Sequence, residues 1–257
     1  MLNEKFYFQR LTGFPVNTVN QHYHSTFEIY YLKSGKCSYF IDNRSYEVEP
    51  GDLILIPEGT IHRTNYSVSK RERLLINCTE DFIPESARKS LTSVIPFYRN
   101  PSTSTRVEEL FSKIEEEYER ADDLTLDALR CLVGELLFLI LRASPTKAAL
   151  KTGSALIENA AKYIQENYAG EIRLSSVAEM LAISPEHLSR SFKRETGFGF
   201  NEYLTLIRLQ KAEYMLIHEP GLSISEVAYA CGFNDSNYFS DKFKRTYGTP
   251  PSKINSR

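Results

Sequence analysis

The sequence predicts an α+β protein of two domains, a β-rich domain followed by an all-helical one. Three observations predict this fold class. Short runs of aromatic and β-branched residues with turn residues between them fill the first eighty positions, as in a sandwich or barrel. After about residue 104 the apolar residues recur at helical spacing. Residues 144–153 (SPTKAALKTG) have the composition of a linker, so we place the domains at 1–143 and 154–257.

Five runs of residues in the first domain are predicted strands. They are residues 26–33 (TFEIYYLK), 36–41, 45–48, 53–56 and 72–77. Gly35, Asn43 and Gly51 lie in the turns between the first four of them. Strands of this length with regular turns predict a β-barrel or sandwich rather than a parallel α/β fold.

Two helices are predicted to complete the first domain, at residues 106–120 and 125–142. The second carries two neighbouring apolar stripes: Leu129, Leu132, Leu136 and Leu139 in one, and Val133, Leu137 and Ile140 in the other. A helix that is apolar over so wide an arc needs cover on two sides. One side would pack on its own barrel and the other on a second copy of the chain, which predicts a homodimer. The alternative is a core helix buried within one chain.

The charge balance favours no particular partner. The chain has 31 basic and 33 acidic side chains, and residues 152–257 contain 12 of each. A role in nucleic-acid binding must therefore be argued from local placement. The four cysteines form no CxxC pair, which is typical of free thiols in a reducing cytosol. With no signal peptide and no membrane-length apolar run, we expect a cytoplasmic protein without a membrane partner.

The second domain begins with a predicted helix-turn-helix unit. Residues 175–182 form a short helix, and Ile183-Ser184 forms the turn. Ser184 has the properties of an N-cap, and Pro185 suits the first position of the next helix. That helix, at residues 185–195, buries Leu188 and Phe192 and stops at Gly197.

A second unit repeats this plan about fifty residues later. A helix at 224–231 is followed by a turn at Gly232, and Asp235 caps a helix at 236–247 that buries Phe239 and Phe243. SVAEMLAISPEHLSRSFKRETG (176–197) aligns with EVAYACGFNDSNYFSDKFKRTYG (226–248), with one extra residue in the second turn. A predicted helix at 201–217 between the units is long enough to hold them about one turn of DNA apart.

The C-terminal hundred residues resemble the DNA-binding domain of AraC-type transcription regulators. The matching residues are Gly197, Tyr203-Leu204, Arg208-Leu209, Ala212, Ile224-Ser225-Glu226-Val227-Ala228, Cys231-Gly232-Phe233, Asp235, Tyr238-Phe239-Ser240, Phe243-Lys244, Gly248 and Pro251. Many relatives have a basic residue in place of Asp241 and an aromatic-arginine pair in place of Ile254-Asn255. The resemblance implies a sequence-specific regulator, by family tendency an activator. It also implies four partners, namely double-stranded DNA, a small-molecule effector, RNA polymerase and a second copy of the chain.

The predicted DNA-binding residues lie on the outer faces of the second helix of each unit. They are Glu186, Ser189, Arg190, Lys193 and Arg194 in the first unit, and Ser236, Asn237, Ser240, Asp241 and Lys244 in the second. The late Lys and Arg residues would contact phosphates, and Arg190 would bond the O6 and N7 atoms of a guanine. A merely solvated helix face is the alternative, most of all for Lys193. Because Asp241 repels phosphates, we expect the first unit to read sequence more stringently.

The first domain resembles a cupin, a barrel that often forms the sensor half of AraC-type regulators. The first motif matches at His22, His24, Glu28 and Gly35, and the second at Gly51, Pro57, Gly59 and His62. Val16 replaces the leading glycine of the first motif, and Tyr66 replaces the asparagine that ends the second. The resemblance implies an effector site at His22, His24, Glu28, His62 and Tyr39. The first four of these also suit a divalent metal, and purely structural roles are the third alternative.

Two functions therefore compete. One is a regulator that responds to an effector, and the other is a metal-dependent cupin enzyme with a helical interaction tail. The duplicated unit favours the regulator, and the sequence shows no catalytic triad, phosphate loop or nucleotide fingerprint, so we expect no enzyme activity and no obligatory cofactor. The 16 tyrosines suit a carbohydrate effector, and the chain near Phe6, Tyr7 and Phe8 is expected to precede the barrel and fold over the occupied pocket.

Overall fold

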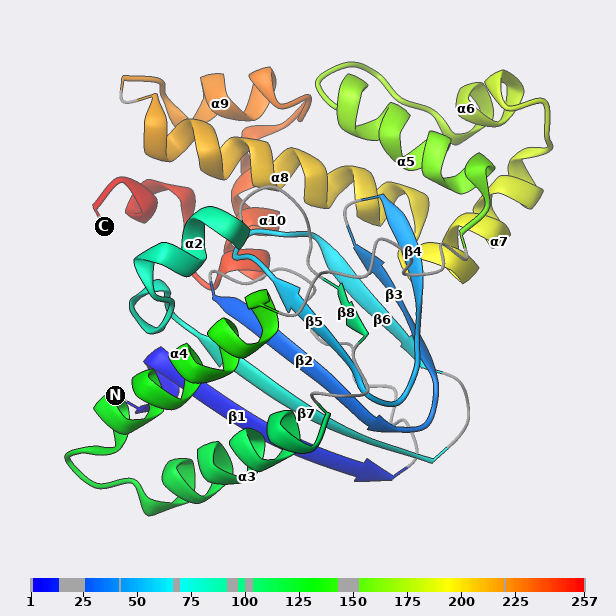
Figure 1. Cartoon of the computed structure of the whole chain (residues 1–257). Helices are drawn as coiled ribbons and strands as arrows, with labels where there is room; N and C mark the ends of the chain where they lie inside the picture. The colour runs from blue at the N-terminus through cyan, green and yellow to red at the C-terminus, as the bar shows by residue number, and fades with distance from the viewer. Residues whose placement is uncertain are drawn as a thin grey trace.

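The computed structural model describes residues 2–13, 26–41, 43–66, 70–91, 97–99, 104–142, 153–219 and 221–256. Two antiparallel sheets and two long helices form the first domain, and the second domain is helical (Figure 1). This arrangement confirms the predicted α+β fold class. None of the described helices is long and apolar enough to cross a membrane.

The larger sheet has five strands in the order β1-β7-β2-β5-β8. Their bounds are β1 Phe6–Gly13, β7 Arg71–Cys78, β2 Phe27–Ser34, β5 Asp52–Ile56 and β8 Phe97–Arg99. The smaller sheet has the order β4-β3-β6, with β4 Arg44–Val48, β3 Cys37–Ile41 and β6 His62–Tyr66. Short helices α1 (Leu2–Lys5), η1 (Glu80–Phe82) and α2 (Glu85–Leu91) flank the strands.

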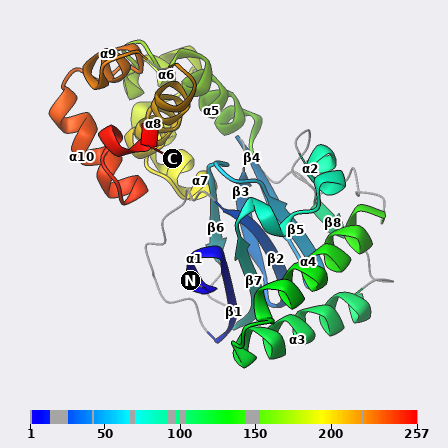
Figure 2. The ribbon, with the colours of Figure 1, turned by 90° about the vertical axis from the view of Figure 1, so that its left-hand side faces the viewer.

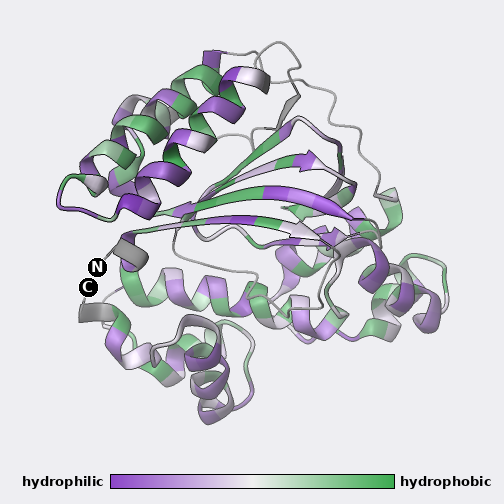
Figure 3. Ribbon diagram, turned by 90° about the horizontal axis from the view of Figure 1, so that it is seen from below, coloured by the Kyte–Doolittle hydropathy of each residue, from purple (hydrophilic) through white to green (hydrophobic). Residues whose placement is uncertain are grey.

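Alternating side chains give the larger sheet two different faces. One face packs against α3 (Ser104–Arg120) and α4 (Thr125–Arg142), with Ile29, Leu74 and Ile76 in the shared core (Figure 2). The opposite face turns toward the smaller sheet and forms a second core around Tyr30 and Tyr39. Figure 3 shows the matching alternation of hydrophobic and hydrophilic residues along the strands. This second core is the barrel interior.

The structure corrects the predicted role of the first residues. Phe6–Gly13 is a full strand that pairs with β7 from Phe6↔Cys78 to Gly13↔Arg71. Phe6 and Phe8 are buried in the core beneath the helices, with ring centroids 6.0 and 6.2 Å from that of Tyr118. Because these side chains are fixed on the side away from the barrel interior, the prediction that this segment folds over the pocket is wrong.

Helix α4 has the predicted bounds, but its own domain covers much of its apolar surface. Leu129, Val133, Leu136 and Leu137 are fully buried between the sheet and α3, whereas Leu132 and Leu139 are half-buried. The two predicted stripes therefore serve mainly the core of one chain. Any contact with a second copy has to use the remaining outer face.

The helical domain holds two small cores joined by one long helix. Its elements are α5 Ala155–Asn167, α6 Leu174–Met180, α7 Pro185–Thr196, α8 Phe200–His218, α9 Ile224–Ala230, α10 Ser236–Tyr247 and η3 Pro251–Ser256. The first half of α8 packs with α5, α6 and α7, and its second half packs with α9 and α10. With 19 residues, α8 is about 28 Å long, so it spaces the two units rigidly.

Candidate nucleic-acid interface and effector site

Helix α7 has the start and the stop that its sequence predicts. The Ser184 hydroxyl accepts a hydrogen bond from the backbone N–H of His187 at 3.2 Å, and Pro185 occupies the first turn. Gly197 ends the helix in the left-handed conformation, with φ +79°. Leu188 and Phe192 are fully buried, so the side chains on the other face point away from the core.

Helix α10 repeats this construction. The Asp235 carboxylate accepts a hydrogen bond from the Tyr238 N–H at 2.6 Å, and Gly248 ends the helix with φ +72°. Phe239 and Phe243 are fully buried. The predicted duplication is therefore present in three dimensions, and we refer to α7 and α10 as the reading helices.

The outer faces of both reading helices carry the ten predicted DNA-binding residues. Eight of them are exposed, and Ser236 and Ser240 are half-buried. On α7, Arg190 and Lys193 are exposed, whereas the Arg194 guanidinium donates to Ser191 and Glu195 at 3.2 Å. On α10, the Arg245 Nε lies 3.1 Å from the Asp241 carboxylate. Arg245 therefore offsets the repulsive charge of Asp241, and DNA contact by these residues stays a prediction.

One exposed aromatic residue of α10 was not singled out from the sequence. Tyr238 is 51% exposed in the first turn, and the Lys242 ammonium lies 5.4 Å from the centre of its ring. Its neighbour Phe239 is buried, so only the position on the helix distinguishes the two aromatic residues. Once the buried Phe239 and Phe243 fix the helical period of α10, the sequence predicts that Tyr238 faces outward.

Three of the five predicted effector residues come together inside the barrel. The Tyr39 hydroxyl donates to Glu28 Oε1 at 3.0 Å, and His62 Nε2 lies 3.6 Å from Glu28 Oε2. Burial raises the pKa of Tyr39 well above its usual range, and the nearby Glu28 charge adds to this shift, so the hydroxyl stays a donor. His62 Nδ1 lies 2.8 Å from the Thr60 carbonyl, which fixes Nδ1 as the donor and turns Nε2 toward Glu28.

The other two predicted effector residues, His22 and His24, lie outside the described residues. Within the described part of the chain, no group of three or more His, Cys, Asp or Glu residues is arranged to hold a metal ion. The proposed metal tetrad is thus represented only by Glu28 and His62. Metal binding by the tetrad stays a prediction.

The end of α7 and the start of α8 pack on the outer face of the smaller sheet (Figure 2). The backbone carbonyl of Glu195 accepts hydrogen bonds from the Ser45 hydroxyl at 3.1 Å and the Asn65 amide at 3.3 Å. A Cβ added to Gly197 would lie 2.5 Å from both Arg63 Cδ and Asn65 Oδ1. The first reading helix therefore ends directly on the sensor domain, a contact that the sequence did not reveal.

Apolar and charged side chains extend this contact between the domains. Phe40 of β3 lies edge-on to Phe198 and Tyr203, with ring centroids 6.2 and 5.6 Å away. Arg63 Nη1 lies 3.3 Å from Glu202 Oε1, and its guanidinium carbon lies 5.0 Å from the centre of the Phe198 ring. Phe40 is only 1% exposed, so the contact excludes water at its centre.

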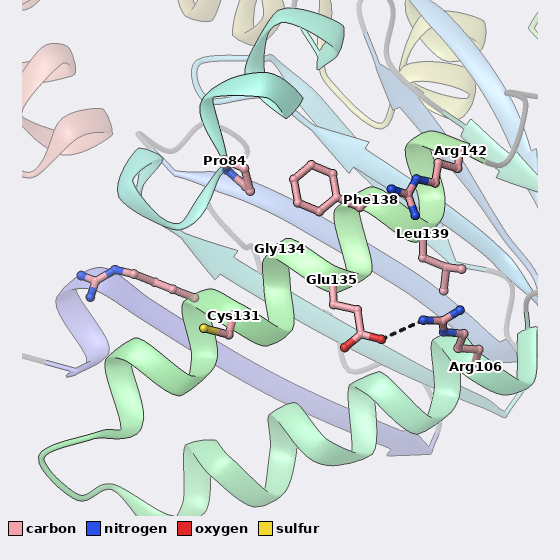
Figure 4. A pocket seen from close by; sticks show the side chains of 9 residues that line it. Pro84, Arg106, Cys131, Gly134, Glu135, Phe138, Leu139 and Arg142 are labelled. Carbon is pink, nitrogen blue, oxygen red and sulfur yellow. Dashed lines mark hydrogen bonds and ion pairs between the residues drawn. The ribbon is translucent and has the colours of Figure 1, made fainter.

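An open groove of about 670 Å³ follows the outer face of α4 (Figure 4). Phe138 is 39% exposed there, and Cys131 is also exposed. Gly134 lies between them along the helix and is buried, with Pro84 of the same chain 3.5 Å from the position of an added Cβ. Arg106 and Glu135 form an ion pair of 3.0 Å at the rim. This groove is the part of α4 that its own chain leaves uncovered.

Comparison with known proteins places these two domains in a family. A profile described as AraC-like ligand binding domain matches residues 10–131, and one described as helix-turn-helix domain matches residues 177–257. Together they cover most of the chain. The protein belongs to the AraC-type family of transcription regulators, in which a cupin-like sensor domain precedes a DNA-binding domain. The exact domain limits and the linker at 144–153 stay predictions.

A curated relative agrees with this assignment, and the chain is also similar to two solved structures. The HTH-type transcriptional activator RhaS of Escherichia coli (strain SE11) is 26% identical over 91% of this chain and 86% of its own. The C-terminal domain of AraT, a response regulator from Geobacillus stearothermophilus, is 37% identical over 41% of this chain and 87% of that domain, with a TM-score of 0.39. ToxT from Vibrio cholerae is 16% identical over 98% of both chains, with a TM-score of 0.41.

Proposed function

We propose that this protein is an effector-responsive activator that works as a homodimer on bacterial operator DNA in the cytoplasm. The duplicated pair of reading helices, with equivalent caps and exposed polar faces, carries the proposal. The name of the RhaS relative, a transcriptional activator, supports activation over repression. An activator has to contact RNA polymerase, which is therefore the second macromolecular partner we propose.

The two reading helices make different contributions to DNA binding. Arg190, exposed one turn into α7, is placed to bond a guanine edge, and Lys193 and Lys244 are placed for phosphate contacts. On α10 the ion pair between Asp241 and Arg245 occupies two of the side chains that face outward. Base reading by the second unit then falls to polar residues such as Asn237, and the first unit reads more stringently.

The effector binds in the barrel interior at Glu28, Tyr39 and His62, together with His22 and His24. The Glu28 carboxylate, whose Oε2 lies 3.6 Å from His62 Nε2, accepts hydrogen bonds. A hydroxyl donor of an effector suits this carboxylate, which supports a carbohydrate. A divalent metal held by the histidines and Glu28 is the second proposal for the same residues.

Strands β3 and β6 connect the effector to the first reading helix. Tyr39 and His62 face the barrel interior, while their neighbours Phe40 and Arg63 face α7 and α8. An effector that shifts either strand therefore moves the outer face of the smaller sheet, on which α7 packs. Such coupling requires the effector to favour one placement of the DNA-binding domain over another.

The groove on the outer face of α4 is the proposed contact with a second copy. Phe138 supplies exposed apolar surface, and the exposed Cys131 lies beside it on the same groove. Arg106, Arg130 and Arg142 at the rim, with Glu135 among them, offer charges that a two-fold axis can pair. The alternative function, a metal-dependent cupin enzyme, has weaker support because the relatives are transcription regulators.

Selection from fragments of the source genome tests this function. Purified full-length protein is incubated with sheared genomic DNA, and bound fragments are sequenced and footprinted. We expect a few promoter-proximal fragments with two protected major grooves on one face of the duplex. Recovery of fragments without any shared sequence, at salt that abolishes non-specific binding, would contradict the proposal.

A further inference from the structure

Two arginines of β7 face the barrel interior instead of solvent. Along β7, Leu74, Ile76 and Cys78 pack against the helices, so Arg71 and Arg73 project from the opposite face with Leu75. Arg71 is 4% exposed and Arg73 is 6% exposed. The Arg71 guanidinium carbon lies 3.5 Å from the centre of the Tyr66 ring, which places this charge beside the tyrosines of the interior.

Several N–H groups of these arginines are buried without hydrogen-bond partners. In the part of the chain that the structure describes, Arg71 Nε and Nη1 and Arg73 Nε have none. Among the described residues, Arg73 Nη2 donates to Gln9 Oε1 at 2.7 Å. Burying a charged donor without a partner costs more than any other common polar defect. Each such group in a native fold requires an explanation, and a bound ligand that supplies the missing acceptors is one.

The chain places two carboxylates in the same interior. Asp52 is fully buried and accepts the backbone N–H of Glu49 at 2.7 Å, and Glu28 accepts from Tyr39 at 3.0 Å. Neither supplies an acceptor to the unpaired arginine N–H groups of the described structure. Burial raises the pKa of Cys37 to about 12, the charges of Arg71 and Arg73 lower it, and the charge of Asp52 raises it. Charges of both signs therefore act in the interior.

Acceptors gather at the other end of the same space. Glu28 pairs with Asn77 across the strands, and Leu32 pairs with Arg73. The acceptor end and the cationic end are therefore four residues apart on β7, about 13 Å along the backbone. The side-chain oxygen of Asn77 is also buried without a partner in the described structure, so it can accept from a ligand hydroxyl there.

We infer that the barrel interior binds a small polyhydroxylated anion, with its carboxylate or phosphate on Arg71 and Arg73 and its hydroxyls toward Asn77 and Glu28. The class comprises sugar acids and sugar phosphates, whose acidic groups match the planar fork of a guanidinium. The inference rests on the proposed function, because it names the chemical class of the effector. It assigns recognition to two residues outside the cupin motifs.

Matched pairs of sugars test this inference by titration calorimetry of the full-length protein. The pairs are glucuronate and glucose, galacturonate and galactose, gluconate and sorbitol, and glucose 6-phosphate and glucose, so the acidic group is the variable and its source is distinguished. We expect at least one anion to bind, and its neutral counterpart to bind at least about tenfold more weakly. Binding of no anion in this set, or equal binding of a neutral partner, overturns the inference. A neutral sugar that binds and changes operator affinity would leave the proposed function intact.

A matched pair of variants locates the site. Arg71→Met should weaken binding of the anion by roughly 10- to 100-fold, and Arg71→Lys should recover part of it. Arg10→Met on the neighbouring strand is the control, because Arg10 pairs with Glu72 and Glu115 on the helix side. It should leave anion affinity unchanged. Equal losses in both variants would place the anion elsewhere and overturn the inference.

Thermal unfolding without any sugar separates a binding role from a structural one. Replacing an incompletely paired buried guanidinium by an apolar side chain of similar length removes an uncompensated charge. Arg71→Met should therefore raise the Tm of the unliganded protein, whereas Arg10→Met should lower it or leave it unchanged. If Arg71→Met lowers the Tm, Arg71 serves the fold itself, and the inference is overturned.

Discussion

Single outward-facing residues distinguish the two reading helices, although their buried residues match. Leu188 and Phe192 in α7 correspond to Phe239 and Phe243 in α10, and both pairs are fully buried. On the outer face, α7 offers the exposed Arg190, whereas α10 offers Asp241 paired with Arg245. The buried residues that fix the scaffold and the outward-facing residues that we predict to contact DNA are therefore separate residues of each helix.

Arg190→Ala should cost about 1–3 kcal/mol at the specific operator and relax the preference at one base pair. Its side chain is exposed and has no role in the core, so the domain should keep its Tm. Lys244→Ala should instead weaken specific and non-specific DNA binding alike and lower the salt slope by about one. Fluorescence anisotropy on operator variants at several salt concentrations measures both. Unchanged operator affinity in folded Arg190→Ala would show that the reading face is assigned wrongly.

Residues could be placed from the sequence where local chemistry decides their role. Ser184 and Asp235 cap their helices because a short acceptor side chain there satisfies a helix N–H. Arg71 and Arg73 were missed, because arginine is expected at the surface and only strand pairing turns them inward. Glu28, Tyr39 and His62 come from three strands, and a resemblance rather than any local pattern brought them together.

At the scale of elements, periodicity was reliable where the element packs on one continuous surface. Helix α4 has the predicted bounds, because its apolar stripes pack on the sheet and α3. Strand β6 (HRTNY) was missed, because it has almost no apolar alternation and is held by pairing with β3. Strand β1 was taken for a segment outside the barrel, since its partner β7 lies more than fifty residues away.

The two helix-ending glycines allow the contact between the domains to be tested. Gly197→Ala and Gly248→Ala each place an alanine at a φ above +70°, at a similar cost of roughly 1 kcal/mol. Only the new Cβ at position 197 meets the sensor domain, at Arg63 and Asn65, whereas the space at 248 is open. We expect Gly197→Ala to lose more thermal stability than Gly248→Ala, because its clash adds to the shared backbone cost, and only Gly197→Ala to weaken the coupling.

The readout is the ratio of operator affinities with and without an effector that binds the barrel. Reciprocity requires the same ratio for effector affinity with and without operator, which calorimetry measures. In wild type and Gly248→Ala the two ratios should agree and differ from one. If Gly197→Ala retains the wild-type ratio while its Glu195–Asn65 contact is broken, the coupling follows another path.

At the scale of the molecule, the largest feature beyond sequence analysis is the way the domains meet. Phe40 and Ile61 belong to the sensor domain by sequence, yet they are buried in the core formed by α5, α7 and α8. In the sequence, a strand with one face in a pocket and the other against a neighbouring domain has the same pattern as any strand that is buried on both faces. Only the assembled fold shows that β3 and β6 serve two cores at once.

The test of the homodimer depends on which residues of α4 are buried within their own chain. Leu136 is fully buried in its own chain, so Leu136→Glu would unfold the domain and reveal nothing about association. Phe138→Glu instead changes the open groove on α4 and should keep the Tm near that of wild type. We expect wild type to sediment as a dimer at micromolar concentration, and Phe138→Glu to weaken the dimer by at least about 2 kcal/mol, roughly 30-fold.

Tyr214→Glu is the matched control, because Tyr214 is an aromatic residue 58% exposed on α8, away from the groove. This variant should sediment as wild type.

Cys131 supplies an independent readout in the unmodified protein. Burial raises the pKa values of Cys37 and Cys78 to about 12 and that of Cys231 to about 11, so at pH 8 a thiol reagent should reach only Cys131. Its labelling rate should fall as protein concentration rises, because the partner covers the groove. A monomeric wild type, or a dimer in which Cys131 labels at an unchanged rate, would show that the outer face of α4 is not the dimer contact.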